Sequence, residues 1–91
     1  MRKLVLFLLV FITVFSFAKV KIQFWHAMGG WRIDLIQGMV NDFMKANPDI
    51  EVEVQYVGSY EEILAKTVAA LQAGTPPHVV QLNEISTKKM V

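Results

Sequence analysis

The sequence predicts an α/β fold in which a parallel sheet is built from strands that alternate with helices. Hydrophobic residues alternate with polar ones in two short segments, 20–25 and 50–56, which is typical of strands. After each of these segments they recur at helical spacing. The resulting order, β-α-β-α-β, favours parallel strands joined by right-handed crossovers. Three strands and two helices leave both sheet edges open, so we expect residues 19–91 to be the incomplete front part of a larger domain.

The first half of this pattern is bounded by a glycine pair and a proline. A strand is expected at Val20–Trp25, followed by a flexible turn over residues 27–30. A wide apolar stripe over residues 33–44 then predicts a helix, which Pro48 ends because it disfavours helical geometry in the residue before it. Residues 50–56 alternate apolar and polar side chains, which predicts a strand with one face exposed to water.

The second half begins with a capping box, Ser59 to Glu62. We expect the Ser59 hydroxyl to accept the Glu62 N–H while the Glu62 side chain reaches back to the Ser59 N–H. An apolar stripe over residues 63–71 predicts the second helix, and Gly74 before a proline pair ends it. Residues 79–82 predict a third short strand, after which Ser86 or Thr87 is expected to begin a further helix.

The first 18 residues have the pattern of a secretory signal peptide. The chain is 54% hydrophobic with a mean hydropathy of +0.40, and the excess lies in this segment. A positive start at Met1–Lys3 precedes an apolar run, Leu4–Phe17, and small residues allow cleavage after Ala18. The run is shorter than a membrane span, so an uncleaved anchor is the weaker alternative. We therefore expect residues 19–91 to be soluble and periplasmic.

Composition excludes several classes of function. The net charge of +1 offers no basic footprint for nucleic acid. The chain has no cysteine and its two histidines, His26 and His78, are far apart in sequence, so we expect no metal site. Dinucleotide, phosphate-loop and nucleophile-elbow motifs are missing from the sequence. We expect no cofactor, no catalytic residue and no enzymatic activity.

Candidate binding residues follow the three predicted strands. Ligands of open α/β sheets bind beyond the carboxyl ends of the strands, where Tyr60 offers an amphipathic ring and Glu84 a carboxylate for hydroxyl groups. Trp25, His26 and Ser59 lie at the same edge as further candidates. Each has a plainer interpretation. Trp25 and His26 fit the core, Ser59 fits a helix cap, Tyr60 covers a helix start, and Glu84 fits an exposed loop.

The motifs, taken together, resemble a known family. They are FWHAM, FMKANP, YVGSYE, AGTPP and VQL, at residues 24–28, 43–48, 56–61, 73–77 and 80–82. In this order they resemble the start of the extracellular solute-binding proteins of ABC importers, a family that includes maltose- and other sugar-binding proteins. FWHAM, GSYEE and QLNE look most like its glycerol-3-phosphate-binding branch.

The resemblance implies a receptor of two α/β lobes that close on a ligand, of which residues 19–91 match the opening of the first lobe. It also implies import of glycerol-3-phosphate or a glycerophosphodiester, with a membrane permease as partner. In that branch a Tyr and a Glu contact the ligand, and they match Tyr60 and Glu84 here. Glu84 is expected on the glycerol hydroxyls, because a carboxylate and a phosphate repel each other in one dry site.

Several alternatives stay open at this point. A sugar or oligosaccharide also presents hydroxyl groups to Glu84, so a sugar-binding protein of the same family is the sibling hypothesis. A secreted enzyme fragment with its catalytic residues downstream belongs to another class. A truncated remnant without a transport role, or a chain completed by a second chain that carries the missing lobe, are the remaining alternatives.

Overall fold

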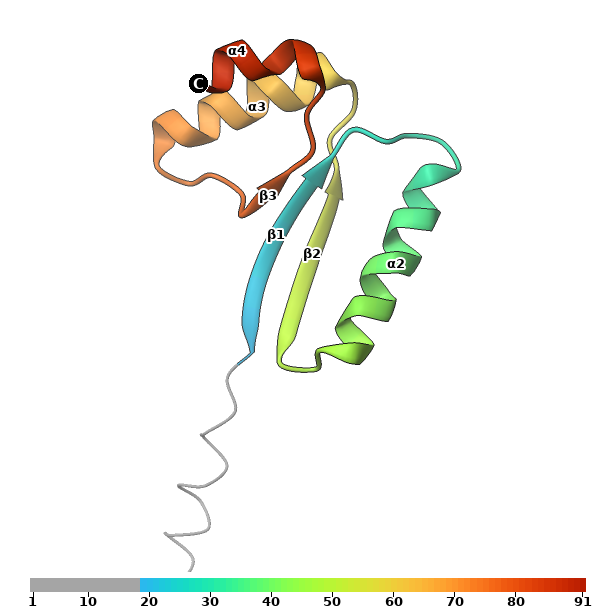
Figure 1. Ribbon diagram of the computed structural model, residues 1–91. Coiled ribbons are helices and arrows are strands. Elements are labelled where there is room, and N and C mark those ends of the chain that lie inside the picture. The colour runs from blue at the N-terminus through green and yellow to red at the C-terminus, as the bar shows by residue number, and fades with distance from the viewer. Residues whose placement is uncertain (1–18) are drawn as a thin grey trace, which may run out of the picture.

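The computed structural model describes residues 19–91. The predicted signal peptide, residues 1–18, lies outside these described residues. Within them, strands and helices alternate as the sequence predicts, and the three strands form one parallel sheet in the order β2-β1-β3 (Figure 1). Among the described helices, none combines the length and hydrophobicity that a membrane crossing requires.

The strands are β1 (Val20–His26), β2 (Ile50–Tyr56) and β3 (Val79–Val80). β1 runs one residue further than predicted, because it pairs with β2 along its whole length, up to His26 opposite Tyr56. β3 is shorter than predicted and pairs only with the end of β1. The parallel sheet that the sequence predicts is confirmed, and its three carboxyl ends meet at one edge.

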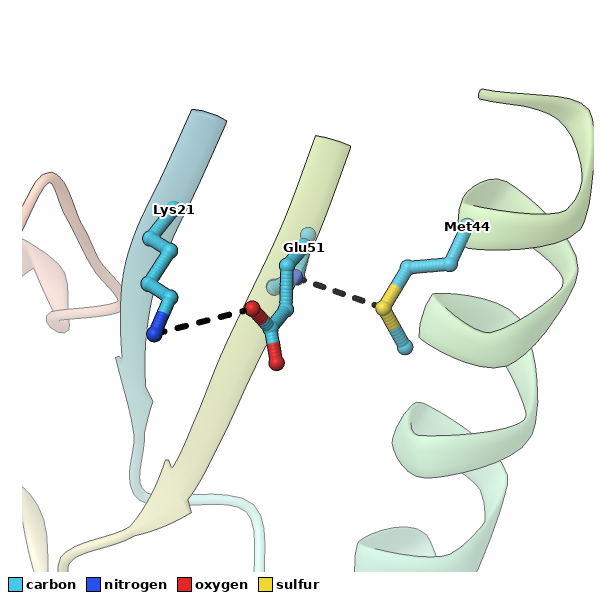
Figure 2. Close-up of polar contacts among 4 residues, drawn as sticks. Lys21, Met44 and Glu51 are labelled. Atoms are coloured by element: carbon cyan, nitrogen blue, oxygen red, sulfur yellow. Dashed lines mark hydrogen bonds and ion pairs between the residues drawn. The ribbon is translucent and has the colours of Figure 1, made fainter. Parts of the chain in front are cut away.

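Helix α2 (Arg32–Ala46) covers one face of the sheet. It ends where Pro48 predicts, and the backbone N–H of Asn47 donates to Phe43 O at 2.9 Å. One backbone group on the unpaired edge of β2 has a hydrogen-bond partner in this helix, since the Val52 N–H donates to Met44 Sδ at 3.3 Å (Figure 2). Figure 2 also shows the pair formed by Lys21 and Glu51, 3.9 Å apart. Both side chains are exposed, so this pair contributes little to stability.

Helix α3 (Tyr60–Ala73) lies on the opposite side, near the carboxyl ends of the strands (Figure 1). Lys66 Nζ of this helix lies 4.3 Å from the ring centre of Trp25. Side chains alternate along a strand, and Phe24, next to Trp25 in β1, faces α2. Figure 1 shows the two helices on either side of the strands. Gly74 ends α3 with a left-handed φ of 76°, and the Thr75 N–H donates to Ala70 O at 2.9 Å. This is the glycine-terminated ending that the sequence predicts.

The chain continues past β3 into a 3₁₀ turn, η2 (Glu84–Ser86), and a short helix, α4 (Thr87–Met90). The predicted further helix is present, but the Ser86 hydroxyl caps nothing. It donates instead to Asn83 Oδ1 at 2.7 Å. The turn and α4 lie beside α3 at the upper end of the sheet in Figure 1.

The described core is small and is divided between the two faces of the sheet. Trp25, Val40 and Ile63 are its buried hydrophobic residues, and the buried polar residues are His26, Thr67 and Ser86. The apolar stripe of α2 is only partly covered, since three residues that line the hollow between this helix and the sheet are 44–63% exposed: Leu35, Met39 and Phe43.

Candidate functional site

His26 is the last residue of β1 and lies at the carboxyl end of this strand. Its imidazole is 1% exposed and lies between the rings of Phe24 and Tyr56, with centroid distances of 5.9 and 5.8 Å. Nδ1 accepts the Met28 N–H at 3.2 Å, so the ring proton belongs on Nε2, which is buried without a partner. Desolvation by burial lowers the pKa of His26 below its usual 6.5, which keeps the ring neutral. His26 is therefore packed beneath the β1–α2 turn, and its contact with a ligand stays a prediction.

Trp25 and Ser59 are also engaged in the fold. Trp25 is 9% exposed and its ring packs beneath Lys66 of α3, as the core interpretation predicts. The Ser59 hydroxyl accepts the Glu62 N–H at 3.1 Å, as the capping box predicts. The reciprocal half differs from the prediction, because the Glu62 carboxylate accepts from the Ser59 hydroxyl at 3.3 Å instead of from its N–H. Ser59 therefore begins α3.

Tyr60 lies at the second strand end, as the first residue of α3. Its side chain is half-buried, and Oη accepts a hydrogen bond from Gln81 Nε2 at 2.8 Å. Gln81 Oε1 in turn accepts the Ala27 N–H at 3.0 Å. One side chain thus connects the segments that follow β1, β2 and β3, and it holds the phenol of Tyr60 at the carboxyl edge of the sheet.

Sequence reasoning missed Gln81, although a signal was present. The residue is polar and stands between Val80 and Leu82, at the point where the third strand ends. A polar side chain flanked by apolar ones at the carboxyl end of a strand is a candidate by position. Its backbone N–H donates to Trp25 O at 2.9 Å, which fixes its side chain at the same edge as Tyr60.

Glu84 begins η2 and is exposed. Its neighbours Asn83 and Ile85 line a pocket of about 130 Å³ together with Tyr60, whereas Glu84 itself is outside the lining. The structure therefore brings the segment of Glu84 to Tyr60, while Glu84 itself is exposed to solvent. No group of three or more His, Asp or Glu residues within 19–91 is arranged to hold a metal ion.

Three hollows within residues 19–91 are larger than this pocket. The smallest of the three, of about 270 Å³, lies on the strands and is lined in part by Trp25. The largest, of about 660 Å³, runs along α3 and reaches Lys89 of α4. The third, of about 530 Å³, lies between α2 and the sheet and is lined by apolar side chains such as Phe24, Met39 and Val79. None of the five predicted site residues lines either of these last two hollows. Of the four, the small pocket at the strand ends is the one that Tyr60 lines.

Comparison with known proteins gives a consistent picture. A family model described as bacterial extracellular solute-binding protein matches residues 29–91. The sn-glycerol-3-phosphate-binding periplasmic protein UgpB of Salmonella typhimurium is 33% identical over 76 residues, which are 84% of this chain and 17% of that protein. UgpB of Yersinia pestis is 32% identical over 76 residues, with the same coverage of both chains. UgpB of Pectobacterium atrosepticum is 34% identical over 74 residues, which are 81% of this chain and 17% of that protein. The chain spans about a sixth of the length of these curated relatives.

Proposed function

This chain belongs to the family of bacterial extracellular solute-binding proteins, and we propose that it forms the opening of the first lobe of a receptor for glycerol-3-phosphate or a glycerophosphodiester. The similarity to glycerol-3-phosphate-binding periplasmic proteins, over 84% of the chain, carries this proposal. The placement of Tyr60 at the carboxyl edge of a parallel sheet supports it.

In this proposal, Glu84 and Tyr60 contact the same ligand at different groups. Glu84 is exposed and accepts hydrogen bonds from the glycerol hydroxyls, since a carboxylate has acceptors only. It avoids the phosphate, because two like charges in a closed site repel. Tyr60, which lines the pocket together with Asn83, contacts an oxygen of the same ligand. The donors that neutralise the phosphate belong to the remainder of the receptor.

The role we propose is binding and release without chemistry. Residues 1–18 direct export, cleavage after Ala18 leaves a chain beginning at Lys19, and the receptor works in the periplasm. It closes on its solute and delivers it to the membrane permease of an ABC importer. A cleft that forms between two lobes binds weakly when one lobe is absent, so residues 19–91 alone are expected to bind poorly.

Calorimetric titration of the secreted protein that carries residues 19–91 tests this proposal. Glycerol-3-phosphate, glycerophosphocholine and maltose are the probes. Glu84→Gln is expected to weaken binding of the glycerol compounds about 10- to 100-fold, which corresponds to a charged hydrogen bond of about 1.5–3 kcal/mol. Glu53→Gln makes the same change on the exposed strand face and is expected to leave affinity unchanged. Equal binding of maltose would favour the sugar-binding sibling.

The intact mass of the native secreted product decides between a receptor and a remnant. A product several times larger than 10.3 kDa agrees with a two-lobe receptor. A product that starts at Lys19 and ends at Val91, with no second chain bound to it, contradicts the proposed transport role. Turnover of glycerophosphocholine by the purified product would instead indicate an enzyme.

A further inference from the structure

The Gln81 side chain connects, through hydrogen bonds, the segments that follow the three strands. Gln81 directly follows β3, and its half-buried carboxamide makes two hydrogen bonds to segments far away in the sequence. Oε1 accepts from the Ala27 N–H at 3.0 Å, and Nε2 donates to Tyr60 Oη at 2.8 Å. Both distances are ordinary for strong neutral hydrogen bonds. The carboxamide is therefore held at both of its ends.

The Ala27 N–H decides which way the carboxamide points. A backbone N–H only donates, so the group that faces Ala27 is the carbonyl oxygen of Gln81. The amide NH₂ must then face Tyr60, and the phenol oxygen accepts from it. A phenol has one proton of its own, and this proton cannot be directed to a group that is itself donating. The Tyr60 hydroxyl is thus turned into a donor for another partner.

We propose that Gln81 is a positioning residue that presents the Tyr60 hydroxyl as a hydrogen-bond donor to an oxygen of the bound solute. The inference rests on the proposed function, since it requires a solute at the strand ends. Hydroxyl and phosphoryl oxygens both accept such a proton, whereas a group that only donates does not. Because Ala27 holds Gln81 before any solute arrives, the phenol is already ordered and binding loses less entropy.

A double-mutant cycle separates this role from a merely structural one. Gln81→Met has similar length and no charge but no amide, and we expect it to weaken binding of glycerol-3-phosphate about tenfold in the secreted protein. In a Tyr60→Phe background the same change is expected to cost at most about twofold, because no hydroxyl is left to orient. Gln72→Met, on the exposed far end of α3, is the matched control and is expected to leave affinity unchanged.

Two results of this cycle overturn the inference. One is an unchanged affinity in Gln81→Met. The other is an equal loss in both backgrounds, which would mean that Gln81 supports only the Ala27 turn. Affinity is measured by the same calorimetric titration in both backgrounds, so the two fold-changes caused by Gln81→Met can be compared directly.

A measurement without solute distinguishes failure of this inference from failure of the proposed function. In the unliganded secreted protein, nuclear Overhauser contacts are expected between the Gln81 carboxamide protons and the Tyr60 ring. Their absence overturns the inference. If these contacts are present but glycerol-3-phosphate, glycerophosphocholine and maltose all fail to bind, the proposed function is contradicted. Gln81 then orients Tyr60, but for none of these three solutes.

Discussion

Acidification is expected to destabilise this chain through His26. The imidazole is 1% exposed, its Nδ1 accepts the Met28 N–H, and its Nε2 has no partner. Burial lowers its pKa below the usual 6.5, so the folded chain keeps the ring neutral at a pH where the unfolded chain protonates it. The unfolded state then binds the extra proton, and stability falls as the pH is lowered below 6.5.

The size of this effect follows from one proton. The free energy of unfolding decreases by at most about 1.4 kcal/mol for each pH unit below the unfolded-state pKa. Between pH 7.5 and 5.5 the loss is therefore at most about 1.4 kcal/mol, since the first of these two units lies above that pKa. The loss stops growing once the pH falls below the lowered pKa of the folded state, where both states are protonated.

Urea unfolding at the two pH values measures the loss directly. His26→Gln removes the titrating ring, so its loss of stability on acidification is expected to be smaller than that of the parent chain. His78→Gln makes the same change at an exposed ring, whose Nδ1 accepts the Gln23 N–H at 2.9 Å, and is expected to keep the loss. The reasoning is refuted if His26→Gln keeps the full loss, or if His78→Gln alone removes it.

Three further predictions concern stability and are measured by urea unfolding at pH 7.5. Ser59→Ala removes the acceptor of the Glu62 N–H and is expected to cost about 1 kcal/mol, whereas an unchanged midpoint would show that the cap contributes nothing. Gly74→Ala places a side chain at φ 76° and is expected to destabilise by about 1 kcal/mol, while Gly38→Ala, with open space in α2, is expected to stabilise by up to about 1 kcal/mol. The same sign for both would contradict this. Ile63→Ala, at a fully buried position, is expected to cost about 2–5 kcal/mol, and a cost below 1 kcal/mol would mean that α3 does not pack as described.

The elements could be predicted from sequence where local chemistry decides them. Ser59 and Gly74 bound α3 through hydrogen bonds to residues within five positions, so the nearby sequence contains all the information. Pro48 ends α2 for the same reason. The parallel order also follows from the alternation of strands and helices, because a crossover connection favours parallel strands.

The environment of the site residues could not be predicted in this way. Gln81 meets Ala27 and Tyr60 across 54 and 21 positions of sequence, and the chemistry of an amide gives no sign of which distant groups it will join. The burial of His26 depends on the pairing of β1 with β2, which extends β1 to this residue, and the local sequence does not show that pairing. Met39 belongs to the apolar stripe of α2 but lines an open hollow between this helix and the sheet, so periodicity alone does not show that it is exposed.

Backbone amide shifts of the secreted protein during titration with glycerol-3-phosphate test the central claim most directly. The claim is that the solute binds at the carboxyl edge of the sheet, where Tyr60, Gln81 and Glu84 follow the strands. We predict saturable shifts at these three residues and none at Val40, which is buried in the middle of α2. Shifts confined to α2 and the hollow beneath it, or no saturable shift at the strand ends, would contradict the claim.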